Sequence, residues 1–162
     1  MFDIFVDEFA TPFSQVPAVV AATRLFAAMT FGGIIGFERE WRNKAAGLRT
    51  HMLVSIAACL FTLVGLEISS LEFGGNDDKR VDPLRLIEAT TAGVAFLAAG
   101  LIFTAGGKVK NVTTGASLWL AGAIGLACGA GQMPLAAMAT VIVVIVVGVV
   151  GLFERRHDED ET

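Results

Sequence analysis

The chain has 162 residues, of which 54% are hydrophobic, and its mean hydropathy is +0.67. It carries only 12 basic and 16 acidic residues, for a net charge of −4. This composition is too apolar for a water-soluble domain of this size, and the net charge argues against a nucleic-acid-binding protein.

Five apolar segments follow one another along the chain, each close to the ~20 residues that an α-helix needs to cross a bilayer. We predict them at residues 16–37, 52–68, 84–105, 114–131 and 134–153. Backbone in lipid must satisfy its own hydrogen bonds, so the expected fold is an all-α, polytopic membrane helical bundle. The transmembrane domain would cover residues 16–153. A periplasmic or interfacial segment (1–15) would precede it, and an acidic cytoplasmic tail (154–162) would follow it.

Basic residues are distributed unevenly between the two sides that these spans define. The side holding the first loop, the third loop and the tail has eight, and the opposite side has three; they are Arg39, Arg42, Lys44, Arg49, Lys108, Lys110, Arg155 and Arg156 against Lys79, Arg80 and Arg85. Basic residues near span ends are retained in the cytoplasm. We therefore expect a periplasmic amino terminus and a cytoplasmic carboxyl terminus.

The loop after the first span carries a long and specific motif. The run GGIIGFEREWRNKAAGLRTHMLVSIAACLF, which begins at Gly32, resembles the signature of the MgtC/SapB family of bacterial inner-membrane proteins. In that signature an Arg in the first span precedes G-ERE, a Lys, AGLRTH and an LV pair. The matching positions are Arg24, Gly36, Glu38, Arg39, Glu40, Lys44, Ala46, Gly47, Leu48, Arg49, Thr50, His51, Leu53 and Val54.

The resemblance resumes in DPLRLIEATTAGVAFLAAGLIF and KNVTTGASLWLAGAIGLACGAG, so it covers most of residues 24–131. The chain departs from the family pattern at Ala95 and Ala98, where glycine is usual, at Ala89, where Gln is common, and in NVTTGA at residues 111–116. The two alanines argue against functions that need close backbone approach in the third span. The sequence ends without the soluble carboxyl-terminal domain of the MgtC branch, so the resemblance implies a short, SapB-like member.

An internal repeat is also visible in the residues. The segment from Arg24 to Gly32 matches the segment from Arg85 to Gly93, and GLRT at residues 47–50 matches NVTT at residues 111–114. Both pairs of spans run from outside to inside and back. We therefore predict two hairpins related by an axis along the membrane normal, followed by a fifth helix.

Arg24 is the charge that lies deepest in the first span. It stands about eight residues into the helix, hence about 12 Å along it, where an unpaired guanidinium is costly. The acids of comparable depth are Asp82, just before the third span, and Glu88, one turn into it. We predict an ion pair between Arg24 and one of them, which either only fixes helix packing or has a functional role.

The charges of the first loop are expected to form a rigid latch between the first two spans. Glu38 and Arg42 are one helical turn apart and should pair, and the turn should bring Arg49 beside Glu38 or Glu40, where its planar fork can bind a carboxylate. Such a network would present a surface to another protein or to an anionic headgroup. Weak Mg²⁺ binding by Glu38 and Glu40 is the alternative, since Mg²⁺ uses one or two carboxylates plus waters; no other cofactor is expected.

Three threonines follow the turns that open helices from the cytoplasmic side. Thr50, and either Thr113 or Thr114, are expected to cap the amino termini of the second and fourth spans. His51 is expected to be a hydrogen-bonded neighbour of the first cap. We assign no chemistry to Cys59 or Cys128, which fall inside predicted spans.

Small residues at four-residue spacing mark helix faces that pack closely in lipid, within the bundle, in a homodimer or in both. These faces are Gly32 with Gly36, Ala95 with Ala99, and Ala121 with Gly125 and Gly129.

The sequence contains no nucleophile with a base, no phosphate-binding loop and no zinc pattern, so we do not expect an enzyme. The family resemblance implies a link to magnesium homeostasis and envelope stress, which we expect to operate through binding to another membrane complex. One alternative is a transporter or channel for Mg²⁺ or another ion, although the intramembrane charges lie towards the span ends. A structural or assembly protein is the second alternative.

Overall fold

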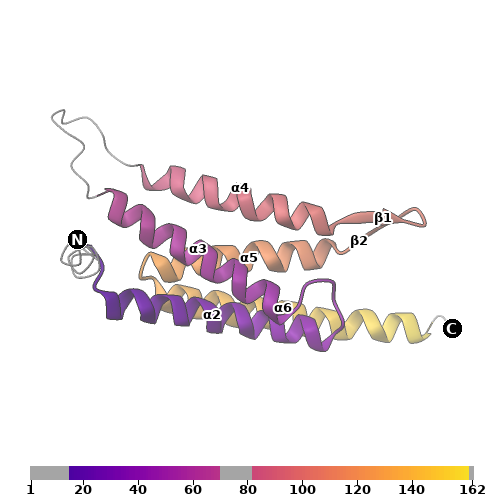
Figure 1. Cartoon of the computed structure of the whole chain (residues 1–162). Helices are drawn as coiled ribbons and strands as arrows, with labels where there is room; N and C mark the ends of the chain where they lie inside the picture. Colours follow the sequence, from indigo (N-terminus) through magenta and orange to yellow (C-terminus); the bar gives the residue numbers. More distant parts are fainter. Residues whose placement is uncertain (1–14, 70–81, 161–162) are drawn as a thin grey trace.

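The computed structural model describes residues 15–69 and 82–160, and in these residues five helices and one short β-hairpin are present. In chain order the elements are α2 (Ala18–Trp41), α3 (Leu48–Ser69), α4 (Pro83–Leu101), β1 (Phe103–Ala105), β2 (Lys108–Lys110), α5 (Val112–Gly129) and α6 (Met133–Asp160). The helices run side by side along one long axis (Figure 1). The predicted all-α helical bundle is confirmed.

Four of the helices, α2 to α5, are long and apolar enough to cross a membrane. With 18 to 24 residues each, and a rise of 1.5 Å per residue, they reach about 27 to 36 Å, which matches the ~30 Å hydrocarbon core. The apolar part of α6 covers Met133–Val149 among the residues whose side chains are described, and the sequence stays apolar to Phe153. The helix itself continues to Asp160, so the segment predicted as a separate tail is helical for most of its length.

Helix ends are set by local sequence signals. Asp82 caps α4, because its Oδ1 accepts from the backbone N–H of Leu84 at 2.9 Å, and Pro83 occupies the first helical position. Helix α5 ends at Gly129, and Gly131 reverses the chain direction with a φ of +80°. A left-handed residue just after a helix is a common stop signal that favours glycine.

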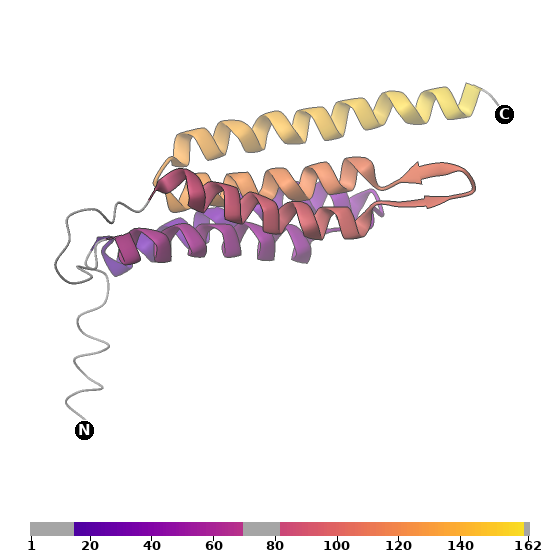
Figure 2. The same cartoon turned by 90° about the horizontal axis from the view of Figure 1, so that it is seen from above.

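The third predicted span extends too far. Residues 103–105, assigned to it from hydropathy, form strand β1, which pairs antiparallel with β2. Gly106 and Gly107, with φ of +61° and +75°, make the two-residue turn, a conformation that suits a tight hairpin and favours glycine. The hairpin projects beyond the bundle at the same end as the carboxyl terminus (Figure 2).

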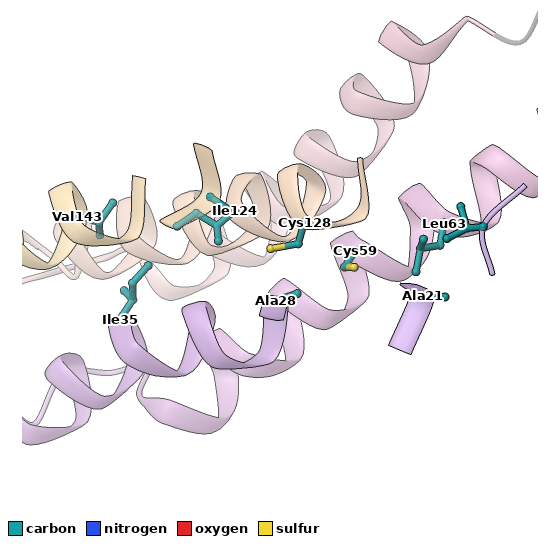
Figure 3. Packing of buried hydrophobic residues seen from close by; sticks show 10 residues of the cluster. Ala21, Ala28, Ile35, Cys59, Leu63, Ile124, Cys128 and Val143 are labelled. Carbon is teal, nitrogen blue, oxygen red and sulfur yellow. The ribbon is translucent and has the colours of Figure 1, made fainter. Parts of the chain in front are cut away.

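Helix α5 lies at the centre of the bundle, where it packs against each of the other four helices. The main apolar cluster joins α2, α3, α5 and α6 through small side chains, including Ala28, Cys59, Cys128 and Ala136 (Figure 3). Both cysteines are free and buried.

Glycines on α5 allow the neighbouring helices to approach its backbone closely. A Cβ at Gly125 would collide with the backbone of Ser55 on α3, and one at Gly122 would lie 2.9 Å from Val94 on α4. The close approach between α4 and α5 thus relies on α5 glycines, which explains how Ala98 can be buried on α4.

The small-residue faces have different outcomes. The glycines of α2 and α5 pack against neighbouring helices as predicted. Ala95 and Ala99 on α4 are exposed instead, so this face is not buried against a neighbouring helix. A homodimer through such faces stays a prediction, as does the internal repeat. The amino-terminal segment lies outside the described residues, except for Gln15, whose N–H donates to Glu67.

Candidate functional site

The predicted latch lies where α2 turns into α3, at the end of the bundle that also bears the β-hairpin; we call this end the turn end. The turn is short because Asn43 adopts a left-handed conformation with a φ of +54°. Its N–H donates to the carbonyl of Glu40, and the N–H of Lys44 donates to the carbonyl of Arg39. These bonds satisfy carbonyls at the carboxyl end of α2 that would otherwise be unpaired.

Glu38 and Arg42 form the predicted pair one helical turn apart. Arg42 Nε lies 2.5 Å from Glu38 Oε1, and both side chains are largely buried, with exposed fractions of 17% and 16%. Arg42 Nη2 also donates to the backbone carbonyl of Gly148 on α6 at 2.7 Å. The pair therefore joins the end of α2 to α6, which the sequence did not indicate.

Glu40 performs the task that was predicted for a threonine. Its Oε2 accepts from the backbone N–H of Leu48, the first residue of α3, at 2.7 Å. Helix α3 begins four residues before the predicted span, so Thr50 lies inside the first turn and is exposed. The prediction that Thr50 caps this helix is wrong, because a carboxylate from the preceding helix reaches the first free N–H.

The expected contact of Arg49 with an acid is also absent. Its side chain is exposed, and no ion pair joins it to Glu38 or Glu40 within the described residues. Because α3 starts at Leu48, position 49 belongs to the first helical turn. The latch is thus closed by Glu40 and a backbone N–H, and the charge of Arg49 stays at the surface.

Arg39 is the most buried charge of the motif, with 2% of its side chain exposed. Its Nη2 lies 3.4 Å from Oγ1 of Thr114 on α5, and its Nη1 lies 3.7 Å from Glu38 Oε2. Thr114 is buried inside the first turn of α5 and Thr113 is exposed. Neither threonine caps α5, because the N-cap position is Asn111 in a left-handed conformation without a side-chain cap bond.

His51 is fully buried and connects α3 to α5. Its Nδ1 donates to the carbonyl of Gly47 at 2.9 Å, and its Nε2 lies 3.1 Å from Oγ of Ser117. The hydroxyl of Ser117 lies 2.9 Å from the carbonyl of Thr114. His51 is therefore hydrogen-bonded near the start of α3, as expected, and Ser117 is a member of the site that the sequence reading missed.

At the opposite end of α2, Arg24 has a different partner from the acids that were predicted for it. Its Nη1 donates to the carbonyl of Gly129 at 2.7 Å, and no ion pair joins it to Asp82 or Glu88 in the described residues. Asp82 caps α4, and Glu88 is exposed. The carbonyls at a helix carboxyl end lack partners and carry partial negative charge, so they can replace a carboxylate as the partner of a partly buried arginine.

Two arginines of α2 thus hold the two ends of α5. Arg24 binds Gly129 at its carboxyl end, and Arg39 contacts Thr114 near its amino end. The separations along the two antiparallel helices are equal at 15 residues, or about 22 Å at 1.5 Å per residue. Arg85, the counterpart of Arg24 in the predicted repeat, is exposed.

The glycines of α2 bring α3 close enough for these contacts to form. A Cβ at Gly32 would lie 2.7 Å from the carbonyl oxygen of His51, and one at Gly36 would lie 2.7 Å from the Cα of Leu48. Only glycine permits backbone contact at both positions, and this contact places His51 and Leu48 in reach of their partners.

Glu38 and Glu40 do not form a joint carboxylate pair. Two positions on a helix two residues apart point in nearly opposite directions, and the two carboxylates have separate partners, Arg42 and the N–H of Leu48. In the parts of the chain that the structure describes, no group of three or more His, Cys, Asp or Glu side chains is placed to hold a metal ion.

Comparison with known proteins identifies the family of the chain. The MgtC family profile matches residues 25–156. The chain belongs to the MgtC family. Its curated relatives include Protein MgtC of Brucella abortus (strain 2308), 40% identical over 130 residues, which cover 80% of this chain and 51% of that protein. Protein MgtC of Salmonella typhimurium (strain LT2) is 39% identical over 119 residues, which cover 74% of this chain and 47% of that protein.

This MgtC-family chain therefore spans about half the length of the curated relatives it matches. No solved structure matches it. Family membership and the four apolar helices of spanning length identify it as a membrane protein.

Proposed function

We propose that this MgtC-family protein acts in magnesium homeostasis and envelope stress in the bacterial inner membrane by binding another membrane complex. The observation that carries the proposal is the division of charges at the turn end. Glu38 is largely buried and paired with Arg42, and Glu40 is exposed but accepts the N–H of Leu48. Four cations are also exposed there: Lys44, Arg49, Lys108 and Lys110. An excess of exposed positive charge favours recognition of an acidic partner surface.

The helix end beside Lys44 and Arg49 is tied to three other helices, whereas Lys108 and Lys110 lie on the projecting hairpin. The end of α2 is tied to α3 through Glu40, to α5 through Arg39 and to α6 through Arg42. Trp41, with 79% of its surface exposed, lies beside Phe37 with ring centroids 5.9 Å apart. An exposed aromatic pair next to fixed cations is a composition that protein interfaces favour.

Ion carriage is the weaker alternative for a single chain. The centre of the bundle is closed by backbone contacts between α3 and its neighbours at Gly32, Gly36 and Gly125. Opening a polar path along this axis would require the helices to separate at all three positions.

The proposal is tested by complementation of a deletion strain under magnesium limitation, with membrane abundance checked by immunoblot. The double variant Lys44→Gln with Arg49→Gln should lose activity at normal abundance, because both side chains are exposed. Arg85→Gln is the matched control: it removes an exposed arginine that lies on α4, away from the turn, and should retain activity. Full activity of the double variant, or an equal loss in Arg85→Gln, would contradict the proposal.

We also propose that the turn end faces the cytoplasm, which would place the partner on that side. The eight-to-three asymmetry of basic residues supports this orientation.

A further inference from the structure

The β-hairpin formed by β1 and β2 lies outside the helix bundle (Figure 2). Each strand has three residues. In the described part of the chain, the two strands pack on each other and make at most sparse contact with the helices. Because an isolated two-stranded hairpin is marginally stable at best in water, a surface beyond the described helices would stabilise it.

The base of the hairpin is fixed where two apolar helices end. Asn111 Nδ2 donates to the carbonyl of Leu101 at 3.1 Å, which joins the end of α4 to the start of α5. The apolar helices on either side, Leu84–Leu101 and Val112–Gly129, have 18 residues each. At about 27 Å each, they take up nearly all of the ~30 Å hydrocarbon core. The hairpin thus begins where the hydrocarbon meets the lipid headgroups.

An exposed tryptophan on another helix marks the same level. Arg39 on α2 contacts Thr114 on α5, and Trp41 and Val112 each lie two residues nearer the turn end. Trp41 is exposed, and tryptophan is enriched where a membrane meets water. The end of α2 and the base of the hairpin therefore indicate one height for the membrane boundary.

Most of the hairpin lies within the depth of the headgroup layer. Three residues of strand extend about 10 Å at 3.4 Å per residue, and the headgroup layer is about 5 to 7 Å deep on each side of the hydrocarbon core. Lys110 is at the base of the hairpin, and Lys108 lies two residues further along the strand. Both lysines are thus at or close to the depth of the lipid phosphates.

The strand register puts both lysines on one face of the hairpin. Phe103 pairs with Lys110, and Ala105 pairs with Lys108. Directly opposed residues of an antiparallel pair share a face. We call these four residues the lysine face; both of its lysines are exposed, and Phe103 is half-exposed. The opposite face carries no charge and consists of Thr104 and Val109.

We propose that the lysine face binds the headgroups of anionic phospholipids in the leaflet at the turn end. The ammonium groups of Lys108 and Lys110 pair with lipid phosphates, and Phe103 lies beside them at the hydrocarbon boundary. Basic side chains close to an anionic membrane surface are attracted to it, and an acidic protein surface would have to displace headgroups that already lie at this depth. The inference does not depend on the proposed partner, whose test changes Lys44 and Arg49.

The experiment uses the full chain in phosphatidylcholine nanodiscs that contain a trace of an anionic phospholipid with a photoactivatable diazirine in its headgroup. Crosslinked residues are mapped by mass spectrometry. In the unmodified chain we expect at least several-fold more label on the lysine face than on Thr104 and Val109. Phosphatidylglycerol added to the nanodiscs should compete with this label, whereas phosphatidylethanolamine, which has no net charge, should not.

The lysines themselves are tested with a charge-matched control. Lys108→Gln with Lys110→Gln should reduce the label at Phe103 by about five-fold for each lysine removed, given the usual attraction of a lysine to an anionic membrane. Lys44→Gln with Arg49→Gln removes the same charge from the same end of the bundle and should leave the label at Phe103 unchanged.

Three results would overturn the proposal. Equal label on the two faces of the unmodified hairpin would mean that the lysine face does not meet the headgroups. Equal competition by phosphatidylethanolamine and phosphatidylglycerol would mean that the hairpin does not select anionic lipid. An equal loss of label at Phe103 in the two double variants would assign the effect to total charge and not to the hairpin.

Discussion

The close contact of α2 with α3 can be tested by adding a single methyl group. A Cβ at Gly36 would lie 2.7 Å from Leu48 Cα, 2.9 Å from Gly47 O and 3.0 Å from His51 Cβ. Because non-bonded carbons are in contact at about 3.5 to 4.0 Å, the first turn of α3 must move by about 0.8 Å or more. Two of the three atoms belong to the backbone, so a change of rotamer cannot relieve the overlap.

Gly36→Ala should therefore destabilise the protein, since overpacking of this kind costs about 1 to 3 kcal/mol. Replacing glycine by alanine within a helix also contributes about 1 kcal/mol of stability through helix propensity. Gly100→Ala has the same propensity gain without an overlap, because no atom lies within 4 Å of its Cβ. The free energies of unfolding of the two variants should thus differ by about 1 to 3 kcal/mol, in favour of Gly100→Ala.

The measurement is unfolding in detergent micelles, followed by tryptophan fluorescence on both variants under identical conditions. If Gly36→Ala melts at the same temperature as Gly100→Ala, α2 and α3 do not touch at this position. The close approach that places His51 and Leu48 would then be incorrect.

Three further outcomes are expected. Arg24→Leu should lower the melting temperature, because it removes a charge-assisted hydrogen bond worth about 1.5 to 3 kcal/mol. Asp82→Asn can still cap α4 and should change the melting temperature little. Equal losses in the two variants would instead support an ion pair between Arg24 and Asp82. Glu40→Gln should keep most of the stability in the same assay, since its amide oxygen can still accept from the N–H of Leu48. Glu40→Ala should lose about 1 kcal/mol. Equal stability of the two variants would contradict the capping role of Glu40. Reporter fusions at position 1 and after His157 should report opposite sides of the membrane, with the second in the cytoplasm.

Most of the fold could be predicted from the sequence because lipid leaves few choices to the backbone. Apolar runs of spanning length had to become helices, and all five predicted segments did, apart from residues 103–105 at the end of the third. The error at residues 103–105 has a clear cause: Phe-Thr-Ala is as apolar as the end of a span, and hydropathy cannot distinguish a helix from a strand. The adjacent Gly106-Gly107 was the signal for a hairpin turn.

The partners of the charged residues were harder to predict. Glu38 with Arg42 was found because helix periodicity fixes neighbours four residues apart. Arg24, Glu40 and Arg42 use backbone groups instead. Every residue carries such groups, so the sequence does not mark which are free; that depends on where helices end and which ends meet.

The motif thus separates into an inner part and an outer part, and this division has a measurable consequence. Glu38 is 16% exposed and lies between Arg39 and Arg42. Glu38→Gln would remove the carboxylate that Arg42 and Arg39 both contact, at a cost of about 1 to 3 kcal/mol. We therefore expect reduced abundance or a lower melting temperature along with any loss of activity. Arg49 forms no ion pair within the described residues, so Arg49→Gln should retain normal abundance and stability. If Glu38→Gln is as abundant and stable as the unmodified protein, its carboxylate does not hold the turn, and the motif's acids belong to the surface that meets the partner.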